Sequence, residues 1–531
     1  MLFVRSMRQL LVIVSAASLV ACGGVGTGNK LNFIRIVTGD TNAPIQNDVI
    51  AYQCLRQNVH LLGTFTDGTV GDYSTRALWT STDDSIVHVS NAILPADAVP
   101  STLAPNGQPE SNTLVYAKGT LVPGANAGTA VITATYLGMS SSVTVQVKTP
   151  AAIFISKDTP SYINGKPLTA PGATPSLTPT PAMTIAPLSL QPLHVLADLD
   201  GNGVPSDVSS FALWSIPADP SGAIATVSSN GIVGGVAINP AAPVNVHVNF
   251  DSCPSIPPGV VTTIDTALTV ANIDHLEMRS EQQNNALYTN LPGKLIALTS
   301  EAMQVLAHFD ATNVDNDPVS HPTQDLSTQS HFYADYNQDC PNLNQAPANP
   351  PVPNPNPVTE LAFSPIPALA NIAVAGAQAS INPFVKLSAS FVVNKPVGGL
   401  AQSICAANDV QRAVVLGTLN AVAIRADQKN LTIQPRGSQQ FNAMGSFLDA
   451  NGAQVGTQDI TRGVVWSVSD TVQAAISNAF NSSGFASSRL GSGGCVNVTA
   501  TNSNAVTTKS DTVQLPISGP NNPATSCPPV P

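Results

Sequence analysis

The stretch ALWTSTDDSIVHVS (77–90) occurs in outline twice more in this chain of 531 residues. The other versions are ALWSIPADPSGAIATVS (212–228) and VVWSVSDTVQAAIS (464–477), and the three together contain every tryptophan. The first two tryptophans are 135 residues apart, and the second and third are 252 apart, nearly twice that spacing. A structural repeat with one hidden copy near residue 340 explains this spacing, and QSHFYADYN (329–337) lies close to that place.

Other short segments recur in step with the tryptophans. Each copy opens on an alternating segment, and an apolar segment that runs into an Asp-containing turn follows it. The opening segments are LNFIRIV (31–37), AIFIS (152–156), IDHLEM (273–278) and VAIRA (422–426). These segments alternate with a period of two, and no stretch with helical periodicity separates them. The sequence therefore predicts an all-β chain of about four tandem β-sandwiches.

The tryptophans are predicted to be the centres of the sandwich cores. In Ala212-Trp214-Ile216 one face of the strand is apolar, and such a face points between two packed sheets. A ring of this size buries roughly 150–250 Å², so one ring can organise a small core. The four predicted core anchors are Trp79, Trp214, Phe332 and Trp466. The alternative is an exposed ring on which a sugar stacks.

The order of these segments resembles that of the bacterial immunoglobulin-like group 2 family, which occurs in intimin-like and invasin-like surface proteins. The resemblance rests on TDGTVGDYSTRALWTSTDDSIVHVS (66–90), GTAVITAT (128–135) and VTVQV (143–147). The third copy lacks the tryptophan and carries long insertions. The resemblance implies immunoglobulin-like sandwiches, and through them a role in adhesion or surface binding. It implies no particular ligand, because such sandwiches serve many functions.

The N-terminus has the features of an export signal. Arg5 and Arg8 precede an apolar run that is too short to span a bilayer, and the run ends in Leu-Val-Ala before Cys22. This order resembles the lipobox of bacterial lipoproteins, which implies acylation of Cys22, for example by palmitate. Gly23 in place of aspartate implies the outer membrane, again by resemblance. An ordinary secretory signal is the alternative.

These observations divide the chain into seven parts. The expected boundaries are a lipoprotein signal peptide at 1–21, a flexible tether at 22–30, module 1 at 31–148, module 2 at 149–271, the divergent module 3 at 272–419, module 4 at 420–518 and an extended tail at 519–531.

Composition and motifs limit the function. The formal net charge is −11 and no cluster of Lys and Arg exists, so nucleic acid is not an expected partner. The chain contains no G-x-S-x-G, no H-E-x-x-H and no P-loop, so we predict that it is not an enzyme. A pair of carboxylates brought together by folding, as in glycosidases, stays open as an alternative.

Six cysteines beyond Cys22 are expected to form disulfides, because their number is even and the chain is exported. The pairing that we propose is Cys54–Cys253, Cys340–Cys405 and Cys495–Cys527, one of fifteen that six cysteines allow. The first of these bonds would join modules 1 and 2.

Two groups of polar residues are candidate metal sites. DLDGNGVPSD (198–207) resembles a calcium loop, with Asp198, Asp200, Asn202 and Asp207 as the candidate ligands. The glutamate expected at the twelfth loop position is absent, and a simple hairpin turn is the alternative. Module 3 has a second group, for which zinc and a solvated loop are the alternatives: His308, Asp310, Asp315, Asp317, His321 and His331.

We therefore expect a non-enzymatic, lipid-anchored protein of the cell outer membrane. Its membrane partner is the bilayer that holds the anchor, and its modules would bind a surface glycan or a protein ligand. The alternative is a periplasmic spacer within an envelope assembly. Four modules end to end predict a rod on the order of 130–160 Å long.

Overall fold

The computed structural model describes most of the chain from residue 29 onward. The described residues are 29–38, 49–91, 117–157, 179–199, 201, 206–239, 242–250, 253, 260–280, 293–312, 320–335, 359–365, 370–380, 384–394, 402–407, 410–425, 428, 432–433, 438–479, 483–488, 494–502, 508–517 and 527. Regular structure in these ranges is strand, apart from short 3-10 turns such as η1 (Ser209–Phe211) and η4 (Thr461–Gly463). Within the same ranges no helix is long and apolar enough to cross a membrane.

The strands follow the repeat in the sequence. Module 1 holds β1 (Leu31–Thr38), β2 (Val49–Tyr52), β3 (Gln57–Phe65), β4 (Val70–Asp72), β5 (Leu78–Ser81), β6 (Val87–Val89), β7 (Thr120–Pro123), β8 (Gly128–Tyr136) and β9 (Met139–Lys148). Module 2 holds β10 (Ala152–Ser156), β11 (Ala182–Ile185), β12 (Leu190–Pro192), β13 (His194–Asp198), β14 (Ser206–Asp207), β15 (Ala212–Ser215), β16 (Ala225–Val227), β17 (Ile232–Gly235), β18 (Val244–Phe250), β19 (Val261–Thr263) and β20 (Asp265–Val270).

The second half of the chain has the same arrangement. Module 3 holds β21 (His275–Ser280), β22 (Lys294–Ile296), β23 (Ser300–His308), β24 (Thr323–Asp325), β25 (His331–Asp335), β26 (Leu361–Phe363), β27 (Ile372–Ala375), β28 (Val385–Asn394), β29 (Gln402–Cys405) and β30 (Val410–Val415). Module 4 holds β31 (Thr418–Ile424), β32 (Ser438–Gln440), β33 (Ala443–Leu448), β34 (Gln454–Asp459), β35 (Val465–Val468), β36 (Ala474–Ile476), β37 (Phe485–Ser488), β38 (Gly494–Asn502) and β39 (Lys509–Ile517).

Each module is a sandwich of facing sheets, as the alternating pattern predicts. In module 1 the sheet β1-β3-β7-β6, with β4 paired to β3, faces the sheet β2-β9-β8-β5, and module 3 repeats this with β21-β23-β27-β26 and β22-β30-β28-β25. In modules 2 and 4 the first sheet is divided, because the long strand corresponding to β3 is split into β12 and β13 or into β32 and β33. The predicted class, an all-β chain of tandem immunoglobulin-like sandwiches, is confirmed.

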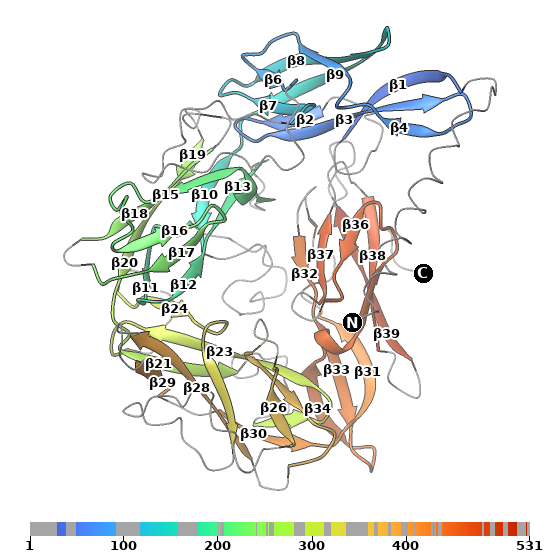
Figure 1. Cartoon of the computed structure of the whole chain (residues 1–531). Coiled ribbons are helices and arrows are strands. Elements are labelled where there is room, and N and C mark those ends of the chain that lie inside the picture. The colour runs from blue at the N-terminus through green and yellow to red at the C-terminus, as the bar shows by residue number, and fades with distance from the viewer. Residues whose placement is uncertain are drawn as a thin grey trace, which may run out of the picture.

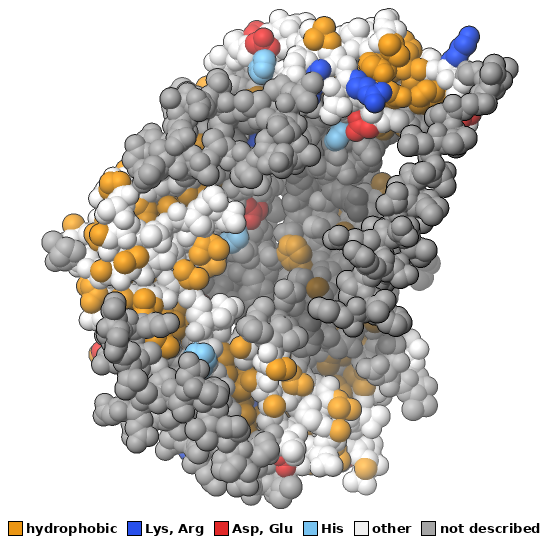
Figure 2. Space-filling model, viewed as in Figure 1, with side chains coloured by type: hydrophobic (Ala, Val, Ile, Leu, Met, Phe, Trp, Pro, Cys, Tyr) orange, Lys and Arg blue, Asp and Glu red, His pale blue; other side chains and the backbone are white. Residues whose placement is uncertain are grey.

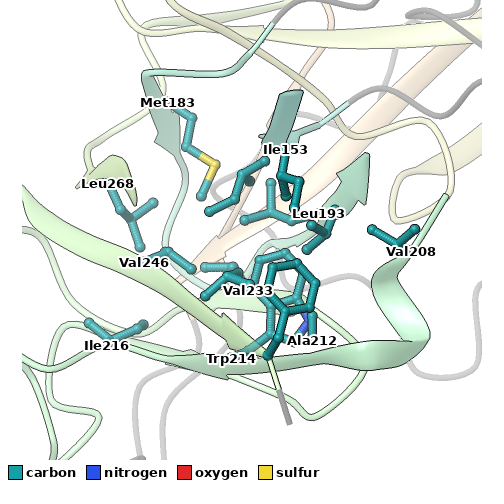
Figure 3. Packing of buried hydrophobic residues seen from close by; sticks show 14 of the residues in the cluster. Ile153, Met183, Leu193, Val208, Ala212, Trp214, Ile216, Val233, Val246 and Leu268 are labelled. Carbon is teal, nitrogen blue, oxygen red and sulfur yellow. The ribbon is translucent and has the colours of Figure 1, made fainter. Parts of the chain in front are cut away.

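The tryptophans lie inside these sandwiches. Trp79, Trp214 and Trp466 are among the largest fully buried side chains, each within the hydrophobic cluster of its own module. Figure 3 shows the indole of Trp214 among Ile153 of β10, Val233 of β17 and Leu193, which lies between β12 and β13. Phe332 is only half-buried and packs on Phe363, with ring centroids 4.9 Å apart. A smaller ring thus occupies the tryptophan position in module 3.

The modules follow an arc rather than a straight line. Figure 1 shows module 1 at the top, modules 2 and 3 down one side and module 4 returning on the other side, so that the two ends of the row approach each other. The expectation of a rod is therefore wrong. It assumed modules stacked end to end along their strands, whereas each joint turns the next module relative to the last.

Candidate functional site: the joints between modules

A hydrogen-bonded clasp precedes the central ring in every module. In each clasp an Asp carboxylate accepts the backbone N–H of a Ser or Thr two residues later, and that hydroxyl accepts a backbone N–H from the neighbouring strand. The four clasps are Asp72–Ser74 with Leu61, Asp207–Ser209 with Val195, Asp325–Ser327 with Val305, and Asp459–Thr461 with Ala443. The Asp lies seven residues before Trp79, Trp214, Phe332 or Trp466 in each case. The clasp thus connects the segment that leads to the central ring with the neighbouring strand by hydrogen bonds.

The clasp aspartates of modules 1 and 2 also pair with histidines. His60 Nδ1 lies 2.9 Å from Asp72, and His194 Nδ1 lies 3.0 Å from Asp207. Burial raises the pKa of both carboxyls, but hydrogen bonds from the clasp serines and from the histidines outweigh it and hold the pKa below its ordinary value. The carboxyls of Asp72 and Asp207 are therefore ionised at neutral pH.

Three joints connect the four modules, and each is built on a similar four-residue turn. The turns are Tyr52–Leu55, Ala186–Ser189 and Ile296–Thr299, and in each the fourth N–H donates to the first carbonyl. The third residue has a positive φ of 63°, 62° or 64° at Cys54, Leu188 and Leu298. Glycine is the usual residue there, so a larger side chain costs free energy at each joint.

The first residue of each turn packs against the core of the following module. Ala186 of module 2 belongs to the hydrophobic cluster of module 3, and Ile296 of module 3 belongs to that of module 4. Tyr52 packs against the cluster of module 2, which also contains Leu55. A side chain of each joint turn thus packs with the buried core of the next module, which opposes bending there.

A buried glutamine closes the joint between modules 2 and 3. Gln324 Oε1 accepts the backbone N–H of Ala186 at 2.9 Å and lies 3.0 Å from the hydroxyl of Ser189. On the surface next to it, Gln329 pairs with both backbone groups of Leu190 at 2.7 Å, as a neighbouring strand would. Gln324 immediately precedes the clasp residue Asp325, so the clasp of module 3 also positions the joint.

The joint between modules 3 and 4 uses the same device. Gln458 Oε1 accepts the backbone N–H of Ile296 at 3.0 Å, and its Nε2 donates to the hydroxyl of Thr299. Gln458 is fully buried and immediately precedes the clasp residue Asp459. Two successive joints therefore share one geometry.

The joint between modules 1 and 2 is covalent instead. Cys54, at the third position of its turn, forms a disulfide with Cys253 of module 2. Arg56 donates to the carbonyl of Ser210 at 3.2 Å, and its guanidinium lies 5.5 Å from the ring centre of Phe211. A disulfide and a cationic contact thus stand where the later joints have a glutamine.

The other predicted cysteine pairs are found in part. Cys495 and Cys527 are joined, as proposed, and this bond ties residue 527 to β38. Cys405 is disulfide-bonded, whereas its proposed partner Cys340 lies outside the described residues, as does the predicted acylation site Cys22.

The candidate calcium loop is described only in part, since Asp200 and Asn202 lie outside the described residues. The carboxylate of Asp207 is engaged by His194 and Ser209, and Asp198 accepts the backbone N–H of Gly201 at 2.9 Å. In the part of the chain that the structure describes, no group of three or more His, Cys, Asp or Glu could hold a metal ion. Calcium at this loop stays a prediction.

The residues of the polar group of module 3 that the structure describes do not form one cluster. His308 is buried and its Nε2 lies 3.0 Å from Glu277, while its ring stacks on His275. Asp310 accepts hydrogen bonds from Thr312 and lies 3.1 Å from His321. His331 is on β25, and Asp315 and Asp317 lie outside the described residues.

We did not predict the joint glutamines from the sequence, although a signal for them exists. TQDLS (323–327) and TQDIT (457–461) stand at the same place in modules 3 and 4. The corresponding residues before the clasp are Gly71 in module 1 and Ser206 in module 2, whose joint to module 1 has the disulfide. A comparison of all four copies outside the tryptophan strand would have found the motif.

Comparisons with known proteins return similar folds at low scores. No family model matches the chain, and no curated protein matches it. The first five extracellular cadherin domains of protocadherin gamma B2 are 10% identical, with 92% of this chain and 80% of that chain covered and a TM-score of 0.14. Domains 4–9 of the surface layer protein SbsC are 10% identical, with 92% and 66% covered and a TM-score of 0.17. Invasin, a bacterial integrin-binding protein, is 11% identical, with 92% and 79% covered and a TM-score of 0.13. Scores this low carry no information about function.

Proposed function

We propose that this protein is a non-enzymatic, lipid-anchored protein of the cell envelope that presents immunoglobulin-like modules for adhesion or for binding a surface ligand. The observation that carries the proposal is the set of three joints, each closed by buried groups. Each joint combines a strained turn residue with contacts that hold the two modules at a set angle. A chain of independent domains on flexible linkers needs no such contacts.

A fixed arc suits the display of a binding surface. Modules that cannot reorient lose less conformational entropy when a ligand contacts two of them at once. The proposed anchor at Cys22 lies at the module 1 end, and we expect ligand binding in modules 3 and 4, which come later in the chain. The alternative, a spacer that bridges envelope layers, depends on reach, and the arc shortens the reach.

Protease shaving of intact cells tests the display. We expect external protease to release peptides of modules 3 and 4, and labelled palmitate to be incorporated at Cys22 but not in a Cys22→Ser chain. Release of these peptides only after the outer membrane is broken would contradict surface display and favour the periplasmic spacer. Absence of label would contradict the anchor.

A further inference from the structure

The end of module 1 that lies away from module 2 exposes several apolar side chains. Phe33 on β1 is 44% exposed, Val70 on β4 is 53% exposed, and Leu137 in the turn between β8 and β9 is 74% exposed. Phe33 and Val70 flank Thr64 on one face of the β1-β3-β4 sheet. Figure 2 shows hydrophobic side chains gathered with Lys and Arg side chains over this end of the module.

Half-buried aromatic rings lie beside these residues. Tyr73 stacks on Tyr136 with ring centroids 4.7 Å apart, and Phe65 lies 6.3 Å from Tyr73. The ring of Tyr73 lies against Gly63 and Gly71, where no side chain stands in its way. The end of the sandwich is therefore a group of tyrosine, phenylalanine and aliphatic side chains, with the exposed cations Lys30 and Arg76 close to it in the sequence.

Leu137 is the least expected of these residues. Its φ is 49° and it precedes Gly138 at 78°, so the pair forms a tight turn of the kind that favours Asn-Gly. A leucine here gains neither burial nor conformational preference. It is exposed at the very tip of the β8–β9 hairpin.

The tether places this end of the module near the membrane. Asn29, where the described chain begins, is seven residues beyond the predicted acylation site Cys22. A chain of that length spans at most about 25 Å. Since Asn29 accepts the backbone N–H of Asp67 in the turn between β3 and β4, this end of module 1 must begin within about that distance of the bilayer surface.

We propose that this end of module 1 docks on the interfacial region of the phospholipid bilayer in which the chain is anchored. The inference rests on the proposed lipid anchor. Tyrosines are enriched at that depth of a bilayer, aliphatic tips gain free energy by entering it, and lysine can extend its ammonium to the headgroups. Asp67, in the exposed turn between β3 and β4, keeps the insertion shallow. Docking at this end sets the angle at which the arc leaves the membrane.

The test is hydrogen–deuterium exchange on the acylated chain, reconstituted into vesicles of phosphatidylethanolamine and phosphatidylglycerol. The reference is the same chain in detergent-free buffer without its acyl group, obtained with Cys22→Ser. We expect uptake in peptides that cover 66–71 and 136–140 to slow about tenfold on the vesicles, as for burial of one or two apolar side chains. Peptides of module 4 should not change.

A double variant distinguishes contact of these side chains with the bilayer from attachment through the acyl group alone. Leu137→Asn suits the turn better than leucine, and Val70→Thr keeps the shape and β-branching, so the pair should fold and yet lose the protection. The matched control is Leu78→Thr with Val465→Thr, which are 59% and 54% exposed on sheet faces elsewhere and should keep it. Equal exchange on and off vesicles, or equal loss in both double variants, would overturn the proposal. If the chain is not acylated, it fails to attach at all, and the proposed function fails instead.

Discussion

At the scale of single residues, the three tryptophans are not equivalent. The indole N–H of Trp79 donates to the carbonyl of Ser74 at 3.0 Å, and that of Trp466 donates to Thr461 at 3.0 Å. The indole N–H of Trp214 is buried and has no hydrogen-bond partner among the described residues. The corresponding carbonyl, Ser209, already accepts the N–H of Ala212 at the end of η1.

Replacement by phenylalanine should expose this difference. Trp79→Phe and Trp466→Phe each remove a hydrogen bond of the indole, although the carbonyl of Thr461 keeps a second donor, the hydroxyl of Ser483, at 2.6 Å. Trp214→Phe removes an unpaired donor. We expect the first two variants to cost about 1–3 kcal/mol more than the third. Calorimetric unfolding of the three single variants measures this, and an equal cost at all three positions would contradict the account.

Asp310 should titrate far below the usual range. The hydroxyl and backbone N–H of Thr312 lower the pKa of this carboxyl to about 2, with a smaller contribution from His321. A depressed folded-state pKa stabilises the fold above the unfolded value near 4, and the stabilisation is lost as the pH falls toward about 2. A carbon-detected NMR titration gives the midpoint. Thr312→Val should raise it and Thr312→Ser should not; a wild-type midpoint near 3.8 would refute the assignment.

Much at this scale could be predicted from the sequence. The recurrence of tryptophan in an alternating strand was enough to place Trp79 and Trp466 in the cores. The partner of each indole was not predictable, because it depends on the exact backbone path between the clasp and the tryptophan strand. The pairing of Cys54 with Cys253 followed from their positions at facing ends of two modules.

At the scale of elements, the joint glutamines should control how modules 3 and 4 are held together. Gln458→Ala leaves the buried N–H of Ile296 without its acceptor, which costs about 1–3 kcal/mol. We expect faster hydrogen exchange at Ile296 and a wider range of angles between the modules. Gln411→Ala, on the exposed face of β30, is the control and should have an effect within about 0.5 kcal/mol. Equal effects of the two substitutions would show that Gln458 does not close the joint.

Module 3 has an ion pair in its interior that the sequence did not indicate. Arg412 on β30 donates to both carboxylate oxygens of Glu301 on β23, at 2.8 and 2.9 Å, and both side chains are buried. The pair connects the two sheets in the module whose central ring is reduced to Phe332. Only the fold brings these two residues together, since 111 residues separate them.

Replacing one partner of this ion pair should destabilise module 3 more than replacing both partners. Arg412→Met leaves Glu301 charged and buried, which costs about 3–5 kcal/mol, whereas Glu301→Leu combined with Arg412→Met should recover most of that loss. Urea denaturation followed by exchange in module 3 peptides measures both. A double variant as unstable as the single one would contradict this interpretation.

The element pattern was predictable where each strand is regular and one face is buried. The clasps and joints were not, because their residues are polar and are held by contacts between segments. TQDLS and TQDIT are alike enough to find by alignment of the copies, but nothing in their composition points to a neighbouring module.

At the scale of the whole molecule, the number and order of modules could be predicted and their path could not. The path depends on the angle at each joint, which small buried contacts set: the Cys54–Cys253 disulfide, Gln324 and Gln458. The expected rod length was the number of modules multiplied by the length of one strand. That calculation assumes straight joints, and this is why the expected rod is wrong.

The first joint should depend most on its covalent bond. With Cys54→Ala and Cys253→Ala together, Arg56 is the remaining polar contact described above for that joint. We expect module 1 to reorient relative to module 2 while both cores stay folded, because the Trp79 and Trp214 clusters are otherwise intact. Unchanged inter-module distances, measured between spin labels on β4 and β16, would show that the disulfide is not what sets this angle.

The joints between modules should hold the four modules in one fixed arc. Small-angle X-ray scattering from the mature chain, compared with the chain carrying Gln324→Ala and Gln458→Ala, tests it most directly. We expect the unmodified chain to scatter as a single curved particle, and the double variant to have a larger radius of gyration and a broader distance distribution. An extended profile for the unmodified chain, unchanged by the two substitutions, would contradict it.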